Sequence, residues 1–266
     1  MTSQLTSPEA DANTITAGQR TLTNLMAERL IQRRDVKAIQ GADGAYSPVR
    51  DPVTRANSRF TLSDLVRHTQ GQATYGHYVV DQAGLCRTLA FDIDFAKEYP
   101  WRGESLNPRD IFGTDHPARA ELNRYIRGMA DGLAWRLKRY FPKLIVITSF
   151  SGGKGIHVYG CYEKPTTAEA AREQALQVLN SFECFEAIRG KSFYQHVSEY
   201  DCLTIEVFPK QEKIGQGGFG NLLRLPLGVH MKSRRRAFFY DPRSEVQELR
   251  PTDPIPALLY GTVRPK

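Results

Sequence analysis

Apolar and polar residues alternate from Leu89 to Phe95. Because successive side chains of a strand point to opposite faces, this alternation predicts a buried strand with Asp92 and Asp94 on one shared face. Two carboxylates held this close repel each other, and burial increases the repulsion, so a cation is expected between them. Oxygen ligands of this kind suit Mg²⁺ or Mn²⁺. The alternative is a strand that runs into a surface loop with two solvated acids.

Shorter apolar runs predict further strands. Residues 75–80 could pair with the Asp92 strand as a hairpin, through a turn near Asp81 to Gly84. Residues 144–148 and 203–208 are also expected to be strands.

Helical spacing of apolar residues predicts several helices. The longest runs from Pro117 to Phe141, and its arginines, Arg127 among them, are expected on a solvated face. Shorter helices are expected from Leu22 to Ile31, from Thr61 to Thr69, and after Thr166, where Glu169 would complete a capping box. The remaining segments, 41–57, 99–115 and 186–200, are expected to be irregular, and residues 1–18 to be a disordered tail.

The overall composition is that of a globular protein with a basic surface. Apolar residues make up 41% of the 266 residues, and the formal net charge is +7. A basic balance fits a nucleic-acid partner. The four cysteines are scattered without CxxC spacing, which argues against a structural zinc site and predicts reduced thiols in a cytoplasmic protein. No apolar run is long enough to cross a membrane.

A glycine-rich turn between two predicted strands is the second feature with chemical potential. Ser151, Gly152, Lys154, Gly155 and His157 lie within seven residues. Glycines let backbone N–H groups approach an anion, Lys154 adds a charge, and Ser151 and His157 can donate to phosphate oxygens. The turn is expected to bind a triphosphate separately from the carboxylates. The alternative is a glycine-rich hairpin with an incidental lysine.

A third acidic residue, Glu206, lies on the strand predicted for residues 203–208. Lys210, Arg224 and His230 follow and are further candidates for phosphate contacts. The alternative roles for these three are a structural salt bridge and a turn lysine.

Together these segments resemble the archaeo-eukaryotic primase superfamily, which includes primase-polymerases. Phe91-Asp92-Ile93-Asp94 is similar to the family's acidic DxD motif, and Ser151 to Val158 resembles its SxH-type motif in a glycine-rich turn. Glu206 matches the third acidic position, where replicative primases carry Asp. Residues 221–230 resemble the RLP…H segment of primase small subunits. The resemblance covers roughly residues 30–240 and extends to the plasmid, conflict-system and CRISPR-associated branches.

The resemblance implies a two-lobed α/β fold, with an RRM-like palm and a mixed or antiparallel sheet flanked by helices. The catalytic domain would span residues 19–250, followed by an extension over 251–266. It also implies template-directed nucleotidyl transfer from NTPs or dNTPs. In that reading, Asp92, Asp94 and Glu206 would hold two divalent ions, Mg²⁺ or Mn²⁺. The triphosphate ligands would be Ser151, Gly152, Lys154, Gly155, His157, Lys210, Arg224 and His230.

The expected partners are a single-stranded DNA template, a primer and nucleotides, without a membrane. The chain could be fused to, or work with, helicase, nuclease or CRISPR adaptation proteins. Two other functions remain open, namely a gap-filling repair polymerase and a metal-dependent nucleic-acid-binding or nuclease module. The complete triphosphate turn argues against binding alone.

Overall fold

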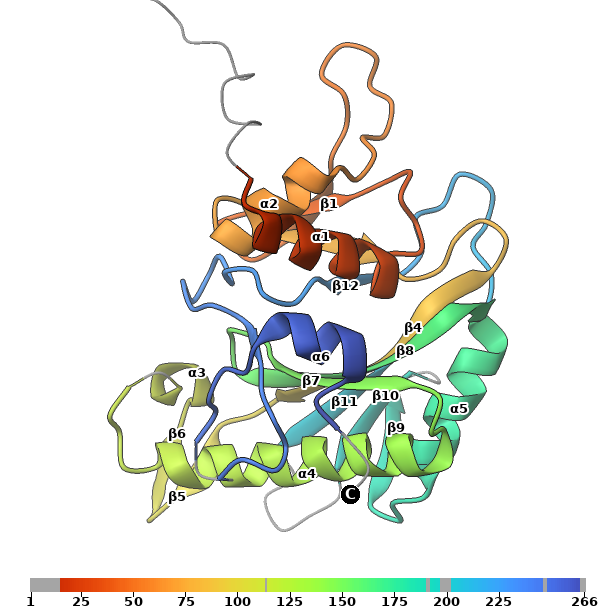
Figure 1. Cartoon of the computed structure of the whole chain (residues 1–266). Helices are drawn as coiled ribbons and strands as arrows, with labels where there is room; N and C mark the ends of the chain where they lie inside the picture. The colour runs from red at the N-terminus through yellow and green to blue at the C-terminus, as the bar shows by residue number, and fades with distance from the viewer. Residues whose placement is uncertain (1–14, 113, 190–191, 197–201, 246–247, 264–266) are drawn as a thin grey trace, which may run out of the picture.

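Two antiparallel sheets form the two lobes of the protein (Figure 1). The computed structural model describes residues 15–112, 114–189, 192–196, 202–245 and 248–263. The larger sheet has the strand order β13-β7-β8-β4-β11-β10-β9. Its strands are β4 (Leu85–Phe95), β7 (Ile145–Phe150), β8 (Gly155–Thr167), β9 (Phe185–Arg189), β10 (Phe193–His196), β11 (Leu203–Phe208) and β13 (Phe238–Phe239).

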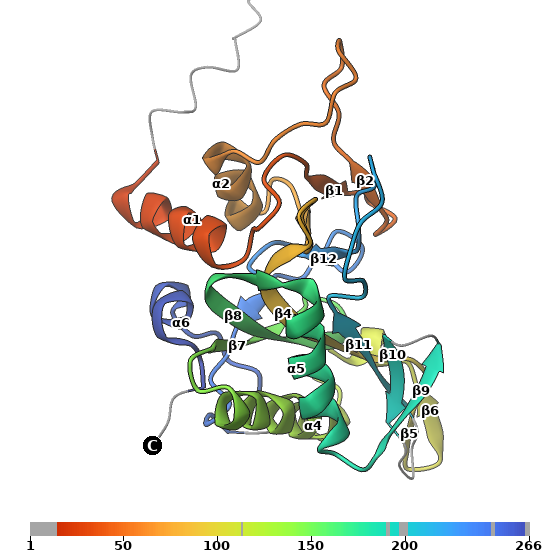
Figure 2. The same ribbon diagram turned by 90° about the vertical axis from the view of Figure 1, so that its right-hand side faces the viewer.

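The predicted alternation along β4 determines the layers of the larger lobe. Leu89, Phe91, Ile93 and Phe95 are fully buried. Phe95 stacks on Tyr125 of helix α4 (Arg119–Tyr140), with ring centroids 6.2 Å apart, so this apolar face lies against α4. Helix α5 (Ala168–Asn180) also packs against the sheet, contacting β4 and β11 (Figure 2). The opposite face of β4 therefore carries Asp92 and Asp94.

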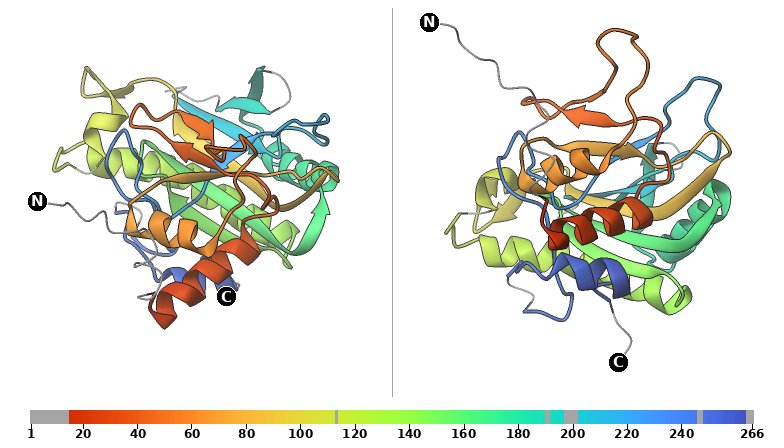
Figure 3. Two further views of the ribbon diagram at one scale, coloured as in Figure 1. Left: turned by 90° about the horizontal axis from the view of Figure 1, so that it is seen from above. Right: turned by 45° about the horizontal axis from the view of Figure 1, so that its top comes forward.

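The smaller lobe lies above that sheet. Its four-stranded sheet has the order β12-β3-β1-β2. The strands are β1 (Ala38–Gln40), β2 (Tyr46–Pro48), β3 (Tyr75–Tyr78) and β12 (Leu222–Arg224). Helix α1 (Ala17–Arg29) contacts both α2 (Leu62–Gln70) and α6 (Pro254–Tyr260), and it lies between them in Figure 3. Since α6 packs on β7, these helices join the two lobes.

The expected fold class is confirmed, and every pairing between described strands is antiparallel. The expected hairpin between residues 75–80 and the Asp92 strand is wrong. The turn at Asp81 to Gly84 does form, with Gly84 N–H donating to Asp81 O over 3.1 Å. However, β3 pairs with β1 and β12 of the smaller sheet, and within the described part of the chain one isolated bridge, Val80 to Cys86, joins its continuation to β4. Tertiary pairing with strands distant in sequence decides this register.

Three segments expected to be irregular contain regular structure. Residues 41–57 include β2. Residues 99–115 include β5 (Tyr99–Trp101), β6 (Glu104–Leu106) and α3 (Pro108–Ile111), and residues 186–200 include most of β9 and β10. These strands are short and receive their order from a neighbouring strand, which local patterning does not reveal. Most of the expected disordered tail, residues 1–14, lies outside the described residues, while Ala17 and Gly18 already belong to α1.

Two details of the expected helices also change. Thr167, not Thr166, caps α5 by accepting from Ala170 N–H, because β8 continues through Thr167 and the helix begins only at Ala168. Arg127 is fully buried rather than solvated. Its guanidinium pairs with Asp131 and donates to the carbonyls of Pro242 and Ser244, among others, so it anchors the C-terminal segment to α4. No helix in the described ranges has the length and apolar character needed to cross a membrane.

Candidate active site

The three predicted carboxylates come from two adjacent strands. Antiparallel register places Glu206 of β11 directly opposite Asp92 of β4, and His157 of β8 opposite Asp92 on its other side. One row across the sheet therefore reads His157, Asp92, Glu206. Two residues further along β4, Asp94 lies between Gly155 and Thr204. The carboxylates of Asp92, Asp94 and Glu206 line a shared cavity of about 210 Å³.

His157 contacts Asp92 directly, with 3.1 Å between Nε2 and Oδ1. Its other nitrogen, Nδ1, lies 2.7 Å from the Tyr159 hydroxyl, which donates to the carbonyl oxygen of Arg224 over 3.2 Å. Because that hydroxyl has one hydrogen, it accepts from Nδ1–H. Nε2 then donates to Asp92 when the imidazole is doubly protonated. Burial acts to raise the pKa of Asp92, but His157, and then Arg224 and Lys210, bring that pKa below its ordinary value.

Asp94 is in a different electrostatic position. Burial, followed by the charge of Asp92, raises the pKa of Asp94 to about 6, although Lys154, His157 and Arg224 act in the opposite direction. Its carboxylate lies over β8, where a Cβ atom on Gly155 would be 1.9 Å from Asp94 Oδ1. Gly155 was expected to contact phosphate. In the structure its missing side chain makes room for Asp94.

The glycine-rich turn is held from within. Ser151 Oγ accepts hydrogen bonds from Gly153 N–H and Gly155 N–H, each over 3.2 Å. Two backbone donors that were expected to face an anion therefore face Ser151 instead. Gly152 has a φ of +79°, and a Cβ there would be 2.7 Å from the carbonyl oxygen of Arg235. Lys154 donates to the carbonyl oxygen of Phe95 and lines the carboxylate cavity, so the turn and the carboxylates are in contact.

His230 approaches the same turn from the smaller lobe's side. Ser233 N–H donates to His230 Nδ1 over 3.0 Å, and the Ser233 hydroxyl lies 2.5 Å from Gly152 O. Because Nδ1 accepts a hydrogen bond, the proton of the neutral ring is on Nε2. Nε2 is close to the turn, since a Cβ atom on Gly153 would lie 3.7 Å from Nε2. Burial, and then the charges of Arg224, Arg109, Arg235 and Lys232, lower the pKa of His230 to about 4. His230 is therefore a neutral N–H donor among arginines.

Lys210 has a different partner from the one expected. Its ammonium group forms an ion pair with Glu206 and lies 4.7 Å from the Phe208 ring centroid. This corresponds to the alternative interpretation, a structural salt bridge. Among the described residues, no three His, Cys, Asp or Glu side chains converge closely enough to hold a metal ion. Three carboxylates in one cavity still form a donor set that fits hard divalent ions, once Glu206 turns away from Lys210.

Sequence reasoning missed two groups around this site. Tyr159 orients His157, and its position two residues along the same strand is the one available signal. Arg109, from a segment expected to be irregular, lines a second cavity of about 390 Å³. That cavity shares Ala96 and Lys154 with the carboxylate cavity. The acidic carboxylate cavity therefore adjoins the basic cavity lined by Arg109.

The fold and the site define an α/β protein with an acidic, cation-bordered site on an antiparallel sheet. The family described as "TOTE conflict system, Archaeo-Eukaryotic Primase domain" matches residues 48–251. The chain therefore belongs to the archaeo-eukaryotic primases, a family of primase-polymerase-type nucleotidyltransferases, and the expected resemblance is confirmed. Of the branches expected, the match is to the conflict-system branch.

Among solved structures, the chain is similar to the polymerase domain of ligase D from Mycobacterium tuberculosis, determined in complex with DNA. The sequences are 14% identical, the TM-score is 0.47, and the match covers 92% of this chain and 86% of that one. No curated protein sequence matches the chain.

Proposed function

We propose that this protein is a primase-polymerase that joins nucleotides on a single-stranded DNA template, both starting and extending primers. The observation that carries the proposal is the row His157, Asp92, Glu206, which joins the three-carboxylate cavity to the glycine-rich turn. An acidic cavity beside a basic one accommodates both divalent ions and a triphosphate. The catalytic domain would span residues 19–250, as the sequence predicts.

In the proposed reaction the 3′-hydroxyl of a primer, or of the first nucleotide when a primer is started, loses its proton to water and its oxygen forms a bond to the α-phosphorus. The bond from that phosphorus to the α–β bridging oxygen breaks, which releases pyrophosphate. Asp92, Asp94 and Glu206 would hold two divalent ions, Mg²⁺ or Mn²⁺, which when bound supply Lewis acidity at the attacking and leaving oxygens. Lys154 and Arg109 line the basic cavity and would bind the triphosphate as cations. His230 would donate from neutral Nε2–H.

His157 would contact both the carboxylates and the bound triphosphate. While Asp92 has no other cation, the imidazole occupies its Oδ1. With Asp92 engaged as a metal ligand, Nε2–H would be free to donate to a phosphate oxygen, while Tyr159 would keep the ring in place through Nδ1. Arg224 contributes a nearby positive charge and the carbonyl that fixes Tyr159.

The test is incubation with a single-stranded DNA template, Mn²⁺ or Mg²⁺ and labelled NTPs or dNTPs, with and without a primer. We expect labelled products in both arms, and loss of both in Asp92→Ala. Extension with a primer but no product without one would identify a gap-filling polymerase instead. Release of nucleotides from DNA with metal alone would identify a nuclease.

A further inference from the structure

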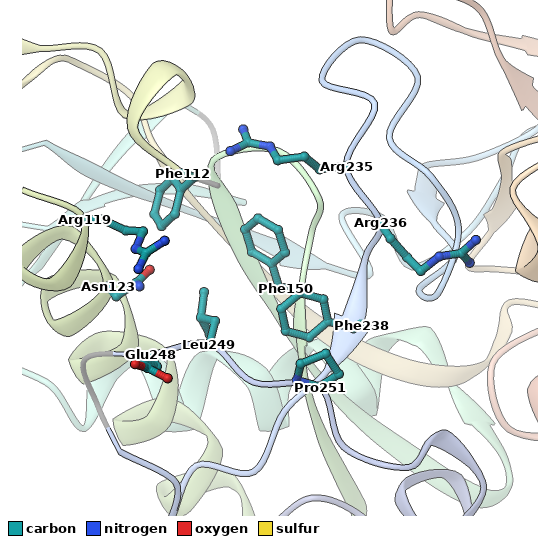
Figure 4. A pocket seen from close by; sticks show the side chains of 10 residues that line it. All are labelled: Phe112, Arg119, Asn123, Phe150, Arg235, Arg236, Phe238, Glu248, Leu249 and Pro251. Carbon is teal, nitrogen blue, oxygen red and sulfur yellow. The ribbon is translucent and has the colours of Figure 1, made fainter. Parts of the chain in front are cut away.

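A third cavity, whose lining residues Figure 4 shows, lies beside α4 and β7 of the larger sheet. Phe150 pairs with Ile156, and Ile156 pairs with Ile93, the neighbour of Asp92 on β4. Because side chains alternate along a strand, Phe150 points toward the α4 side of the sheet, away from Asp92. The cavity has a volume of about 570 Å³, within the range of roughly 300–1,000 Å³ that is typical of small-molecule sites.

Aromatic rings form most of its apolar wall. Phe150 lies between Phe112 and Phe238, with ring centroids 5.9 Å and 5.3 Å away, and Leu249 faces them in Figure 4. Flat apolar groups bind well against such rings, and nucleobases do so independently of sequence. A wall of this kind fits a planar heterocycle better than it fits a chain of polar groups.

The polar groups at the rim are mainly cationic. Arg119 extends from α4 with its side chain 43% exposed. Its Nη1 donates to the carbonyl oxygen of Thr114 over 2.8 Å and lies 3.6 Å from the exposed carboxylate of Asp115, with which a phosphate would compete. Arg235 lies at the part of the rim next to the glycine-rich turn. Its Nη1 is buried without a hydrogen-bond partner among the described residues. An unpaired buried N–H is costly, and a phosphate oxygen is a strong acceptor for it. The lining acid, Glu248, is already bonded to Arg250 over 2.6 Å.

We propose that this cavity is a second nucleotide-binding site, with the base against Phe112, Phe150 and Phe238 and the phosphate on Arg119 and Arg235. The same Arg235 guanidinium donates from Nη2 to the carbonyl oxygens of Gly153, over 2.9 Å, and Arg109, over 3.1 Å. A nucleotide held there contacts the group that braces the glycine-rich turn. The proposal concerns binding and stands apart from the proposed polymerase activity.

Photolabelling with 8-azidoadenosine 5′-monophosphate in EDTA tests this site, because divalent ions are then unavailable to the carboxylates. We expect mass spectrometry to find the label on peptides that contain Phe112, Phe150, Phe238 or Leu249. AMP should protect at concentrations at least about tenfold lower than adenosine does, since only AMP carries the phosphate.

Two variants decide the location. Leu249→Trp fills the cavity and Arg119→Glu reverses a rim charge, and either should reduce labelling about tenfold or more. Arg139→Glu, an exposed position on the same helix, should label like the wild type. If thermal unfolding shows that Leu249→Trp is destabilised, Arg119→Glu alone decides. Labelling confined to other peptides, unchanged labelling in Arg119→Glu, or equal protection by adenosine and AMP would overturn the proposal.

Discussion

His157 Nε2 lies 3.1 Å from Asp92 Oδ1, so the second predicted motif contacts the first. The contact follows from the register of β4 and β8, which pairs these two residues directly. Triphosphate binding and metal binding are therefore expected to be coupled, rather than separate as the sequence alone indicated.

Tyr159→Phe should lower nucleotide incorporation about fivefold. The substitution removes the acceptor of His157 Nδ1–H, and one such hydrogen bond contributes about 1 kcal/mol. Steady-state primer extension measures the effect. Tyr162→Phe is the matched control, because Tyr162 is on the same strand and bonds Gln174 of α5 over 2.8 Å. Equal activity of the two variants would show that Tyr159 does not position His157.

Asp92→Asn and Asp94→Asn should both abolish incorporation yet differ in stability. The folded-state pKa of Asp94, about 6, lies above its unfolded value of 3.8, so ionised Asp94 costs stability above pH 6. Asp94→Asn should therefore melt at the same or a higher temperature at pH 8. Asp92→Asn should be destabilised by about 1–3 kcal/mol, because it leaves buried His157 without its carboxylate. Thermal unfolding in EDTA distinguishes them, and the reverse order would contradict the assignment.

Gly155→Ala should reduce incorporation at least about a hundredfold, and because the new Cβ would also be 2.5 Å from the Ile93 carbonyl oxygen, thermal unfolding is measured alongside activity. The new Cβ would occupy the position of the Asp94 carboxylate, and displacing a catalytic group by about 1 Å costs about this much. Gly215→Ala is the control, because a Cβ there would meet nothing within 4 Å. Near-normal activity of Gly155→Ala would show that Asp94 works from another position.

Lys210→Met separates two roles for this lysine. If Lys210 holds Glu206, as the ion pair indicates, its removal should free that carboxylate and lower the metal concentration needed for half-maximal incorporation, by about two- to tenfold. If Lys210 binds phosphate, the KM for nucleotide should rise instead. Parallel titrations of Mn²⁺ and of nucleotide distinguish these outcomes.

The protein should lose stability as pH falls from 6.5 to 4. Mainly through burial, the pKa of His68 falls from 6.5 in the unfolded chain to about 4 in the folded protein. Between these two pH values the unfolded chain binds the proton more tightly, so protonation favours unfolding. The ring is held neutral, accepting from Tyr75 N–H and lying 2.9 Å from Pro226 O through Nε2. Its contribution is on the order of 3 kcal/mol.

The measurement is the free energy of unfolding by urea at several pH values. His68→Gln should make the pH dependence shallower but not flat, because burial also lowers the pKa of His77 to about 4. His116→Gln is the control, because His116 is a histidine whose side chain is only half-buried. A slope that His68→Gln leaves unchanged would assign the acid sensitivity to other groups.

The sequence by itself determined the local features that carry the chemistry. A period of two along Leu89 to Phe95 is sufficient to place Asp92 and Asp94 on one face, and the same logic orients Glu206 on its strand. The long stripe of α4 and the short helix predicted from Thr61 to Thr69, which the structure places at Leu62–Gln70, follow equally from local spacing. These inferences succeed because the hydrophobic period of a strand or helix depends on neighbours within a few residues.

Tertiary structure alone decided what these groups contact. Register between β4, β8 and β11 joins His157, Asp92 and Glu206, although these residues are far apart in sequence. Arg127 looked solvated because charge on a helix is usually exposed, yet segments more than 100 residues away supply the carbonyls that pair it. Strand pairing and burial depend on distant partners, and the pattern of one segment carries no record of them.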